Sequence, residues 1–458
     1  MENIEVKNPF SGNIVNTYPV QNLEQVRERI LLSQQAQKTW SKVSLTERVN
    51  LVQKALSYFE DHREDIARDI SLQMGRPFSQ AKGEISGLLD RANYLCSIAE
   101  KTLADDVIED SENFYRAIQH VPLGVIFIIS AWNYPLLITI NGVIPALLAG
   151  NAVILKHSST TPAIGQHFEK ALSQLGDHSP LLQSIVVGHE TTGKIIEDLP
   201  IHHLIFTGSV KGGREILKHA AKKFMMPQLE LGGKDGAYVA ADADIKNAAA
   251  TIVDGAMFNS GQSCCGIERV YVHEKVYDDF LNEALELVKQ YRLGDPLQET
   301  TNLGPVAHAH SIDFMLEQIQ EATSKGAKVL FGGKDEIIQQ GRFLQPTLLV
   351  DVDHTMDIVK EENFGPILPI IKVKGDEEAF TFINDSDYGL TCAIFTQDQE
   401  LAKKFSEQAE TGTVFMNRCD YLDPALPWTG VKNSGVGSGL SKYSFYGVTR
   451  RKSIHFKK

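Results

Sequence analysis

The feature that most constrains the fold is a series of short apolar runs separated by stretches long enough for a helix. The first group follows residue 121, at 125–130, 152–156, 184–187 and 203–206. A second group follows a glycine-rich turn near residue 230, at 269–273, 367–373, 393–396 and 413–417. Strands that alternate with helices are typical of βαβ units, in which helices bury a parallel sheet on both faces. The sequence therefore predicts an α/β fold with two successive layers.

Helical patterns fill the remaining sequence, and the first hundred residues are predicted to be helical. Ser44 and Glu47 there form a capping-box pattern that precedes apolar residues at helical spacing. Further amphipathic helices are predicted at 276–291 and 312–325.

Two segments fit neither layer. Residues 104–122 and the last dozen residues alternate polar and apolar side chains, as an exposed hairpin and a terminal strand do. Because exposed strand edges usually need a partner, we expect a homodimer or homotetramer.

Charge and cysteine content exclude several classes of protein. The 458 residues carry 45 basic and 58 acidic side chains, for a net charge of −13. A chain this acidic repels a phosphate backbone, so no nucleic-acid binding is expected. The five cysteines are scattered and odd in number. They match neither a disulfide framework nor a paired metal motif, so we expect a cytoplasmic protein without a metal site.

One uncharged stretch, residues 121–155, is long enough to span a bilayer. Pro122, Pro135 and Pro145 interrupt it, so a buried strand, turn, helix and strand is the better interpretation. The first twelve residues read as neither a signal nor a transit peptide. No membrane partner is expected.

Cys264 and Glu230 are the strongest candidates for chemistry. Cys264 lies in a glycine-rich turn, where backbone N–H groups can lower the pKa of a thiol. A pair of buried structural cysteines, Cys264 and Cys265, is the alternative. Glu230 precedes a Gly-Gly turn, and a carboxylate beside a thiol can act as a general base for water. Taken alone, such a glutamate is more often a surface or helix-capping residue.

Three further motifs are suggestive only in combination. Asn133, in a Trp-Asn-Tyr-Pro turn, presents an amide that can donate to a developing oxyanion. The glycines of residues 206–213 follow a strand and open a helix, where a pyrophosphate can approach. Their spacing is not G-x-G-x-x-G, so it is a weak dinucleotide signal. Residues 361–366 place a carboxylate beside an aromatic ring at a turn.

In this order the motifs resemble the aldehyde dehydrogenase superfamily. The resemblance covers almost the whole chain, from about Asn8 to Gly435, and is nearest to the short bacterial succinate-semialdehyde dehydrogenase-like group. It implies a non-acylating enzyme that oxidises an aldehyde with NADP or NAD. It also implies the aldehyde dehydrogenase fold. That fold has a Rossmann-type cofactor domain (1–103 and 123–231), an α/β catalytic domain (232–440) and a bridging hairpin with a terminal strand (104–122 and 441–458).

The resemblance also assigns roles. Cys264 is the nucleophile that attacks the aldehyde to give a thiohemiacetal, whose oxyanion Asn133 and the Cys264 backbone N–H would hold. Glu230 would activate the water that hydrolyses the thioester. Cofactor contacts carry over to Trp132, Lys156, Ser159, Gly208, Ser209, Gly213, Leu231, Glu362 and Phe364.

Ser159 bears on the choice of cofactor. The family often has a ribose-binding glutamate three residues after the lysine, and Ser159 takes that position after Lys156. A carboxylate there would repel a 2′-phosphate, whereas a serine beside a lysine can accept one. We therefore expect NADP to be used at least as well as NAD.

The substrate pocket departs from the nearest group. Asn141 stands where that group often has an arginine, which removes one anchor for a carboxylate-tailed substrate. Arg418 or Lys432 could substitute. An apolar, aromatic-lined tunnel is suggested by Trp132, Tyr134, Phe258 and Trp428.

Alternatives remain at this stage. The enzyme could act specifically on succinate semialdehyde, or it could be a relative that passes the acyl group to coenzyme A. Such acylating relatives commonly lack the carboxylate that Glu230 supplies. A non-enzymatic binding protein would tolerate the loss of Cys264, Glu230 or Asn133, and all three are present.

Overall fold

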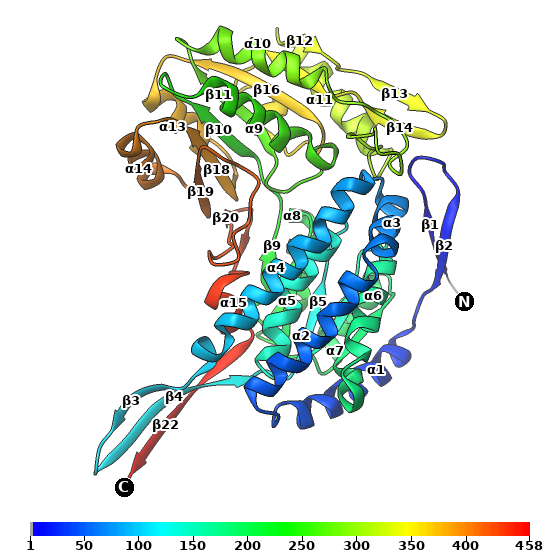
Figure 1. Cartoon of the computed structure of the whole chain (residues 1–458), viewed down its shortest axis with the longest axis vertical. Coiled ribbons are helices and arrows are strands. Elements are labelled where there is room, and N and C mark those ends of the chain that lie inside the picture. Colours follow the sequence, from blue (N-terminus) through cyan, green and yellow to red (C-terminus); the bar gives the residue numbers. More distant parts are fainter. Residues whose placement is uncertain (1–2) are drawn as a thin grey trace.

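Two β-sheets covered by helices form the frame of the molecule (Figure 1). The computed structural model describes residues 3–458; Met1 and Glu2, with which the first predicted domain begins, lie outside the described residues. The prediction of an α/β fold is confirmed.

The first sheet has six strands and carries the predicted βαβ series. Its order is β21 (Gly435–Val436), β9 (Gln228–Glu230), β8 (His203–Thr207), β5 (Val125–Ile129), β6 (Ala152–Lys156) and β7 (Leu182–Ile185). All neighbours are parallel except β21, which runs antiparallel to β9.

Side-chain alternation explains why this sheet is buried on both faces. Val125, Phe127 and Ile129 of β5 pack into one apolar cluster, whereas Ile126 and Ile128 pack into another. The first cluster includes side chains of α1 (Leu23–Trp40), α7 (His189–Asp198) and α8 (Val210–Ala221). The second includes those of α2 (Leu45–Asp61), α3 (Arg63–Met74), α4 (Phe78–Leu103), α5 (Pro135–Leu148) and α6 (Pro162–Ser173).

The second sheet has seven strands. Its order is β12 (Lys328–Phe331), β15 (Thr347–Val350), β16 (Ile367–Val373), β11 (Ile267–His273), β10 (Asp235–Val239), β18 (Thr391–Phe395) and β19 (Thr413–Met416). One face packs on α9 (Ile245–Met257) and α10 (Tyr277–Val288). The other packs on α11 (Ser311–Ser324), α12 (Asp357–Lys360), α13 (Asp376–Asn384) and α14 (Gln399–Gln408).

The chain passes from the first sheet to the second between β9 and β10, close to the predicted change after residue 230. It returns near its end, where β21 pairs with β9 and aligns Gly435 with Glu230. The domain boundaries themselves stay a prediction.

The two segments that fit neither layer form one exposed three-stranded sheet. β4 (Phe114–Pro122) pairs with both β3 (Asp106–Asp110) and β22 (Thr449–Lys457), all antiparallel. Figure 1 shows this sheet projecting away from the body of the molecule, next to the C-terminus. The remaining short elements are the pairs β13 (Asp335–Ile338) with β14 (Gly341–Leu344) and β17 (Tyr388–Gly389) with β20 (Val431–Lys432), η1 (Gly176–Leu181), η2 (Phe258–Gly261) and α15 (Ser441–Gly447).

Some local predictions were wrong. The chain begins with a hairpin of β1 (Asn3–Lys7) and β2 (Ile14–Pro19) rather than a helix, and its side chains are mostly exposed, so they show no strong apolar period. β7 lies two residues before its predicted position. Ser44 caps α2 by accepting from the Glu47 backbone N–H at 3.2 Å, but only this half of the capping box forms.

The uncharged stretch of residues 121–155 folds as β5, α5 and β6, whose side chains are mostly buried. Across residues 3–458, none of the helices is long and apolar enough to cross a membrane.

Candidate active site

Cys264 follows a tight turn after α9. Asn259, Ser260 and Gly261 have φ values of 54°, 57° and 72°, a left-handed backbone that costs energy for residues other than glycine. A Cβ on Gly261 would lie 2.1 Å from the carbonyl carbon of Gly365, so only glycine fits there. The strained turn is thereby packed against the loop of residues 361–366 and holds Cys264 at a half-buried position.

Cys265 is a structural neighbour of Cys264. It is buried, and its Sγ donates to Oδ1 of Asp420 at 2.9 Å. The adjacent Cys264 thiol and burial together raise the pKa of the Cys265 thiol well above its usual value. Cys265 therefore stays protonated, which leaves Cys264 as the thiol available for reaction.

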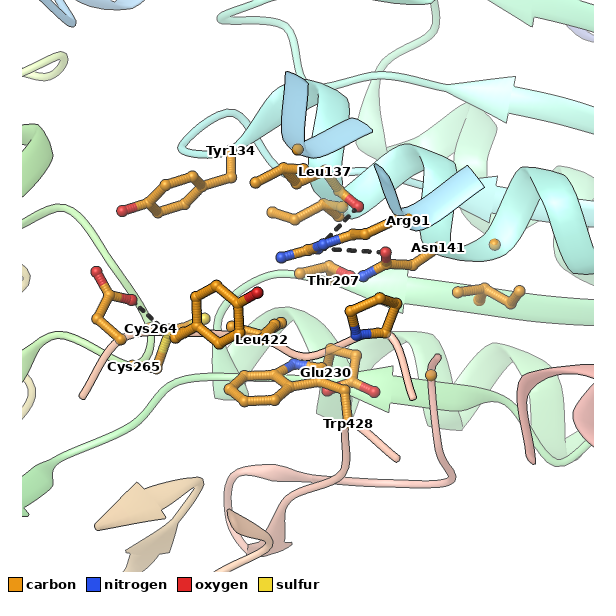
Figure 2. Close-up of a pocket in the computed structure, with 18 of the residues that line it drawn as sticks. Arg91, Tyr134, Leu137, Asn141, Thr207, Glu230, Cys264, Cys265, Leu422 and Trp428 are labelled. Carbon is orange, nitrogen blue, oxygen red and sulfur yellow. Dashed lines mark hydrogen bonds between the residues drawn. The ribbon is translucent and has the colours of Figure 1, made fainter. Parts of the chain in front are cut away.

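A cavity of about 260 Å³ opens at Cys264 (Figure 2). Tyr134, Phe258 and Trp428 line it, as predicted for the aromatic tunnel, whereas Trp132 lines the other side of Cys264. Glu230 lies in the same cavity wall. A thiol and a carboxylate thus face one largely apolar space.

Glu230, at the end of β9, is buried, with 8 % of its surface exposed. Among the described residues its Oε2 has no hydrogen-bond partner, and Oε1 lies 3.4 Å from the side-chain amide of Gln228. Desolvation raises the pKa of this carboxyl to about 8. A carboxyl held near neutral pKa can take up and release a proton at working pH, as a general base must.

Asn133 is fixed by a buried polar network. Its Nδ2 donates to the carbonyl of Gln262 at 3.2 Å, and its own carbonyl accepts from Asn259 Nδ2 at 3.1 Å and from Arg76. Arg76 pairs with Glu84 at 2.5 Å, and both side chains are 1 % exposed. The side-chain amide of Asn133 carries two hydrogens, and only one is used by Gln262. The other can donate a hydrogen bond to a ligand in the cavity that Asn133 and Cys264 both line.

A second cavity, of about 220 Å³, meets the first at Cys264. Cys264, Thr207 and Leu231 line both cavities. The second is also lined by the predicted cofactor residues Trp132, Gly208, Ser209, Glu362 and Phe364, together with Asn133. Cys264 therefore lies where two separate molecules can meet.

The groove above α8 suits an anionic group. Ser209 caps this helix by accepting from the Gly212 backbone N–H at 3.1 Å, and the helix N-terminus attracts negative charge. Cβ atoms on Gly208 and Gly213 would lie 2.7 Å from the Phe206 ring and from the Leu231 side chain. These glycines thus let α8 begin close to the sheet.

The loop of residues 361–366 closes the second cavity. Glu362 Oε1 accepts from the Gly233 backbone N–H at 2.9 Å, and the rings of Phe364 and Trp132 meet edge-on at 5.7 Å. Burial, reinforced by the charge of Glu268, raises the pKa of Glu362 to about 8. A carboxyl that accepts hydrogen bonds beside an aromatic ring fits the hydroxyls and the flat ring of a nucleoside.

Three of the predicted cofactor residues lie outside this second cavity. Ser159 is exposed and lines a small hollow with Ser158 and Val187. Lys156, at the end of β6, and Gly213 line neither cavity. Lys156 is buried, and desolvation lowers the pKa of its amine to about 8.

The sequence missed three charged residues of the first cavity, Asp90 and Arg91 on α4 and Asp420 after β19. The suggested substitutes for an arginine at Asn141 lie elsewhere. Arg418 stacks over the Tyr421 ring at 3.7 Å and lines a neighbouring hollow, and Lys432 pairs with Glu410 at 2.8 Å. In residues 3–458 no group of three His, Cys, Asp or Glu is placed to hold a metal ion.

Fold and site together define a two-sheet α/β protein with a half-buried cysteine thiol between two cavities. The sequence model of the aldehyde dehydrogenase family matches residues 1–454, and the chain belongs to this family. The prediction of an NAD(P)-dependent aldehyde dehydrogenase is thereby confirmed.

Individual relatives are similar over nearly their whole length. The D-glyceraldehyde dehydrogenase (NADP(+)) of Picrophilus torridus is 31 % identical, over 99 % of this chain and 93 % of its own. The glutarate-semialdehyde dehydrogenase of Pseudomonas putida is 31 % identical, over 96 % and 92 %. A succinic semialdehyde dehydrogenase from Streptococcus pyogenes, solved with NADP+, superposes with a TM-score of 0.95 at 28 % identity, covering 99 % and 100 %. The predicted aldehyde dehydrogenase fold is confirmed.

Proposed function

We propose that this protein oxidises an aldehyde to a carboxylic acid through a covalent thioester on Cys264. The observation that carries the proposal is the position of Cys264 at the meeting point of two cavities. One of them contains Glu230, a buried carboxyl with an unpaired oxygen. The other is lined by residues suited to a nucleotide.

The first step is addition of the Cys264 thiolate to the aldehyde carbon. The free N–H of Asn133 and the Cys264 backbone N–H stabilise the resulting oxyanion, and such a donor typically contributes about 10²–10³-fold in rate. NADP or NAD, held in the second cavity by residues such as Ser209, Glu362 and Phe364, would supply the hydride acceptor needed as the thiohemiacetal collapses. Cys264 then carries a thioester.

The second step is hydrolysis. Glu230 takes a proton from water, and the water oxygen attacks the thioester carbon. The C–S bond then breaks, which releases the carboxylic acid and returns Cys264 as a thiolate. Burial of Glu230 supports this role because its raised pKa, about 8, makes it a stronger base than an exposed carboxylate. Its presence also favours hydrolysis over transfer to coenzyme A.

Production of reduced nicotinamide with a panel of aldehydes tests the proposal. Cys264→Ala should abolish turnover. The matched variant Cys265→Ala should retain it, because the Cys265 thiol stays protonated and donates a hydrogen bond to Asp420. Equal activity of the two variants would contradict the assignment. Formation of acyl-coenzyme A on adding coenzyme A would favour the acylating alternative.

We propose that NADP serves at least as well as NAD. Lys156 is the last residue of β6, Ser159 follows it by three residues at the same end of the first sheet, and no carboxylate occupies position 159. Ser159→Glu should lower kcat/KM for NADP by at least about tenfold and spare NAD, because like charges brought together are costly. An unchanged NADP/NAD ratio would contradict this.

We further propose a homo-oligomer, dimer or tetramer, assembled through the projecting sheet of β3, β4 and β22. Val107, Ile108 and Phe456 on it are 56 %, 61 % and 59 % exposed, more apolar surface than an isolated edge usually shows. Light scattering of the purified chain tests this, and a monomer would contradict it. The five free cysteines support a reducing compartment such as the cytoplasm.

A further inference from the structure

Arg91 is a buried cation in the wall of the Cys264 cavity. It lies on α4 and is 8 % exposed. Its Nη1 donates to Asn141 Oδ1 at 3.2 Å and, at the limit of a hydrogen bond, to the Leu137 carbonyl at 3.5 Å. Among residues 3–458, Nε and Nη2 have no acceptor and no carboxylate forms an ion pair with the side chain.

None of the nearby carboxylates forms an ion pair with Arg91. Asp90, its neighbour on α4, lines the same cavity but is exposed to solvent. Glu84, on the same helix, pairs with Arg76 and accepts from the backbone N–H groups of Leu136 and Leu137 at 2.8 and 3.0 Å. Asp420 accepts from Cys265. A buried guanidinium without a carboxylate is energetically unfavourable unless a ligand supplies the negative charge.

Arg91 and Cys264 line the same cavity, so one ligand can reach both. Figure 2 shows Arg91, Leu137 and Asn141 on one side of the cavity, with Cys264, Leu422 and Trp428 on the other. The wall between is largely apolar and suits a short methylene chain. A molecule that spans the cavity can therefore place a reactive carbon at Cys264 and an anionic end at Arg91.

We propose that Arg91 is a specificity-determining residue that binds the carboxylate of an aldehyde substrate carrying an acid group at its far end, a dicarboxylic semialdehyde. The inference rests on the aldehyde oxidation proposed above. The free Nε–H and Nη2–H groups form one edge of the planar guanidinium, and this edge matches the two oxygens of a carboxylate. A hydroxyl would leave most of the charge uncompensated. Asn141 orients the guanidinium through Nη1.

The test compares aldehydes that differ only at the far end. Steady-state kcat/KM is measured for the four-, five- and six-carbon semialdehydes and for their methyl esters, with wild type, Arg91→Met and Arg91→Lys. We expect wild type to prefer the carboxylate form at one chain length at least. Arg91→Met should lower kcat/KM for that acid roughly 100-fold, mainly through KM, because removing one partner of a buried charge pair has effects of this size.

Arg27→Met is the matched control, since it removes the same charge from the exposed face of α1. It should leave the acid-to-ester ratio unchanged. Arg91→Lys should restore part of the preference. Equal losses for acid and ester in Arg91→Met, or an ester preference of wild type at every length, would overturn the proposal.

Direct binding separates this inference from the catalytic one. Succinate, glutarate and adipate do not react, and calorimetry with Cys264→Ala measures their affinity without turnover. Binding that is lost in the Cys264→Ala/Arg91→Met double variant supports the anchor even if no aldehyde is oxidised. Affinity that is equal in both proteins, or no binding of any diacid, overturns it.

Discussion

The two flanks of Cys264 differ in how their buried polar groups are satisfied. On the flank that holds Asn133, Arg76 forms an ion pair with Glu84, and the side chain and backbone carbonyl of Asn133 are both hydrogen-bonded within the chain. On the cavity flank, Glu230 has an unpaired oxygen and Arg91 lacks a carboxylate. The polar side chains of both flanks are buried, so burial alone does not identify the side on which chemistry is proposed.

The difference separates scaffold from chemistry. A saturated network fixes geometry, because each group that moves loses a hydrogen bond in a medium of low dielectric constant. A buried polar group without a partner is energetically unfavourable in the free enzyme, and it is stabilised when it binds water, a proton or a ligand. Substitutions on the two flanks should accordingly affect different measurements.

The largest effect is expected from Glu230→Gln. Loss of the general base should lower kcat by about 10²–10⁴-fold, while thioester formation continues. Rapid mixing should show about one equivalent of reduced nicotinamide per active site, followed by a slow phase. Loss of this first turnover would contradict a role confined to hydrolysis.

Arg76→Met should instead destabilise the protein. It leaves the Glu84 carboxylate buried without its partner, which typically costs about 3–5 kcal/mol. Urea unfolding of wild type and variant gives the difference. A free energy of unfolding that is unchanged would contradict the structural role, and Glu84→Gln in the same background should recover part of the loss.

The pH dependence of kcat gives a smaller effect. With a Glu230 pKa of about 8, roughly a tenth of this base is ionised at pH 7 and nine tenths at pH 9, so kcat should rise about ninefold over this range where hydrolysis limits the rate. A profile that is flat between these values would contradict the raised pKa.

The same group links stability to pH. The folded-state pKa of Glu230 is raised from 4.5 to about 8, so its contribution to stability is fully present below 4.5 and is lost as pH rises through 8. Denaturant titrations of wild type and Glu230→Gln should therefore agree most closely below pH 4.5, and the stability advantage of the variant should grow through pH 6 to pH 9.

The smallest effect is expected far from both flanks. Ser44→Ala removes the side-chain cap of α2, at a typical cost of about 1 kcal/mol, and should leave kcat and KM unchanged. A change in either constant would mean that α2 contributes to the site, and would weaken the contrast between the two flanks.

The sequence predicted what is encoded locally. The β-branched runs predicted strands, and the glycines predicted turns at their ends. Cys264, Glu230 and Asn133 were therefore predicted at strand ends or turns, and in the structure all three line the two cavities that meet at Cys264. Arg91 had no such signal, because it stands in an ordinary helical pattern and its cavity is formed by segments from across the chain. The partners of Asn133 were missed for the same reason, since Arg76, Glu84 and Asn259 become neighbours only on folding.

The pairing of β21 with β9 has a consequence for biosynthesis. Glu230 is translated well before Gly435, its strand partner, which lies about 200 residues further along the chain. Ser434, which accepts from the Leu231 backbone N–H, arrives just before it. An incomplete product that stops short of these residues carries the reactive thiol but lacks the strand that encloses the base. The proposed hydrolytic step therefore requires that the chain has been synthesised through Ser434 and Gly435.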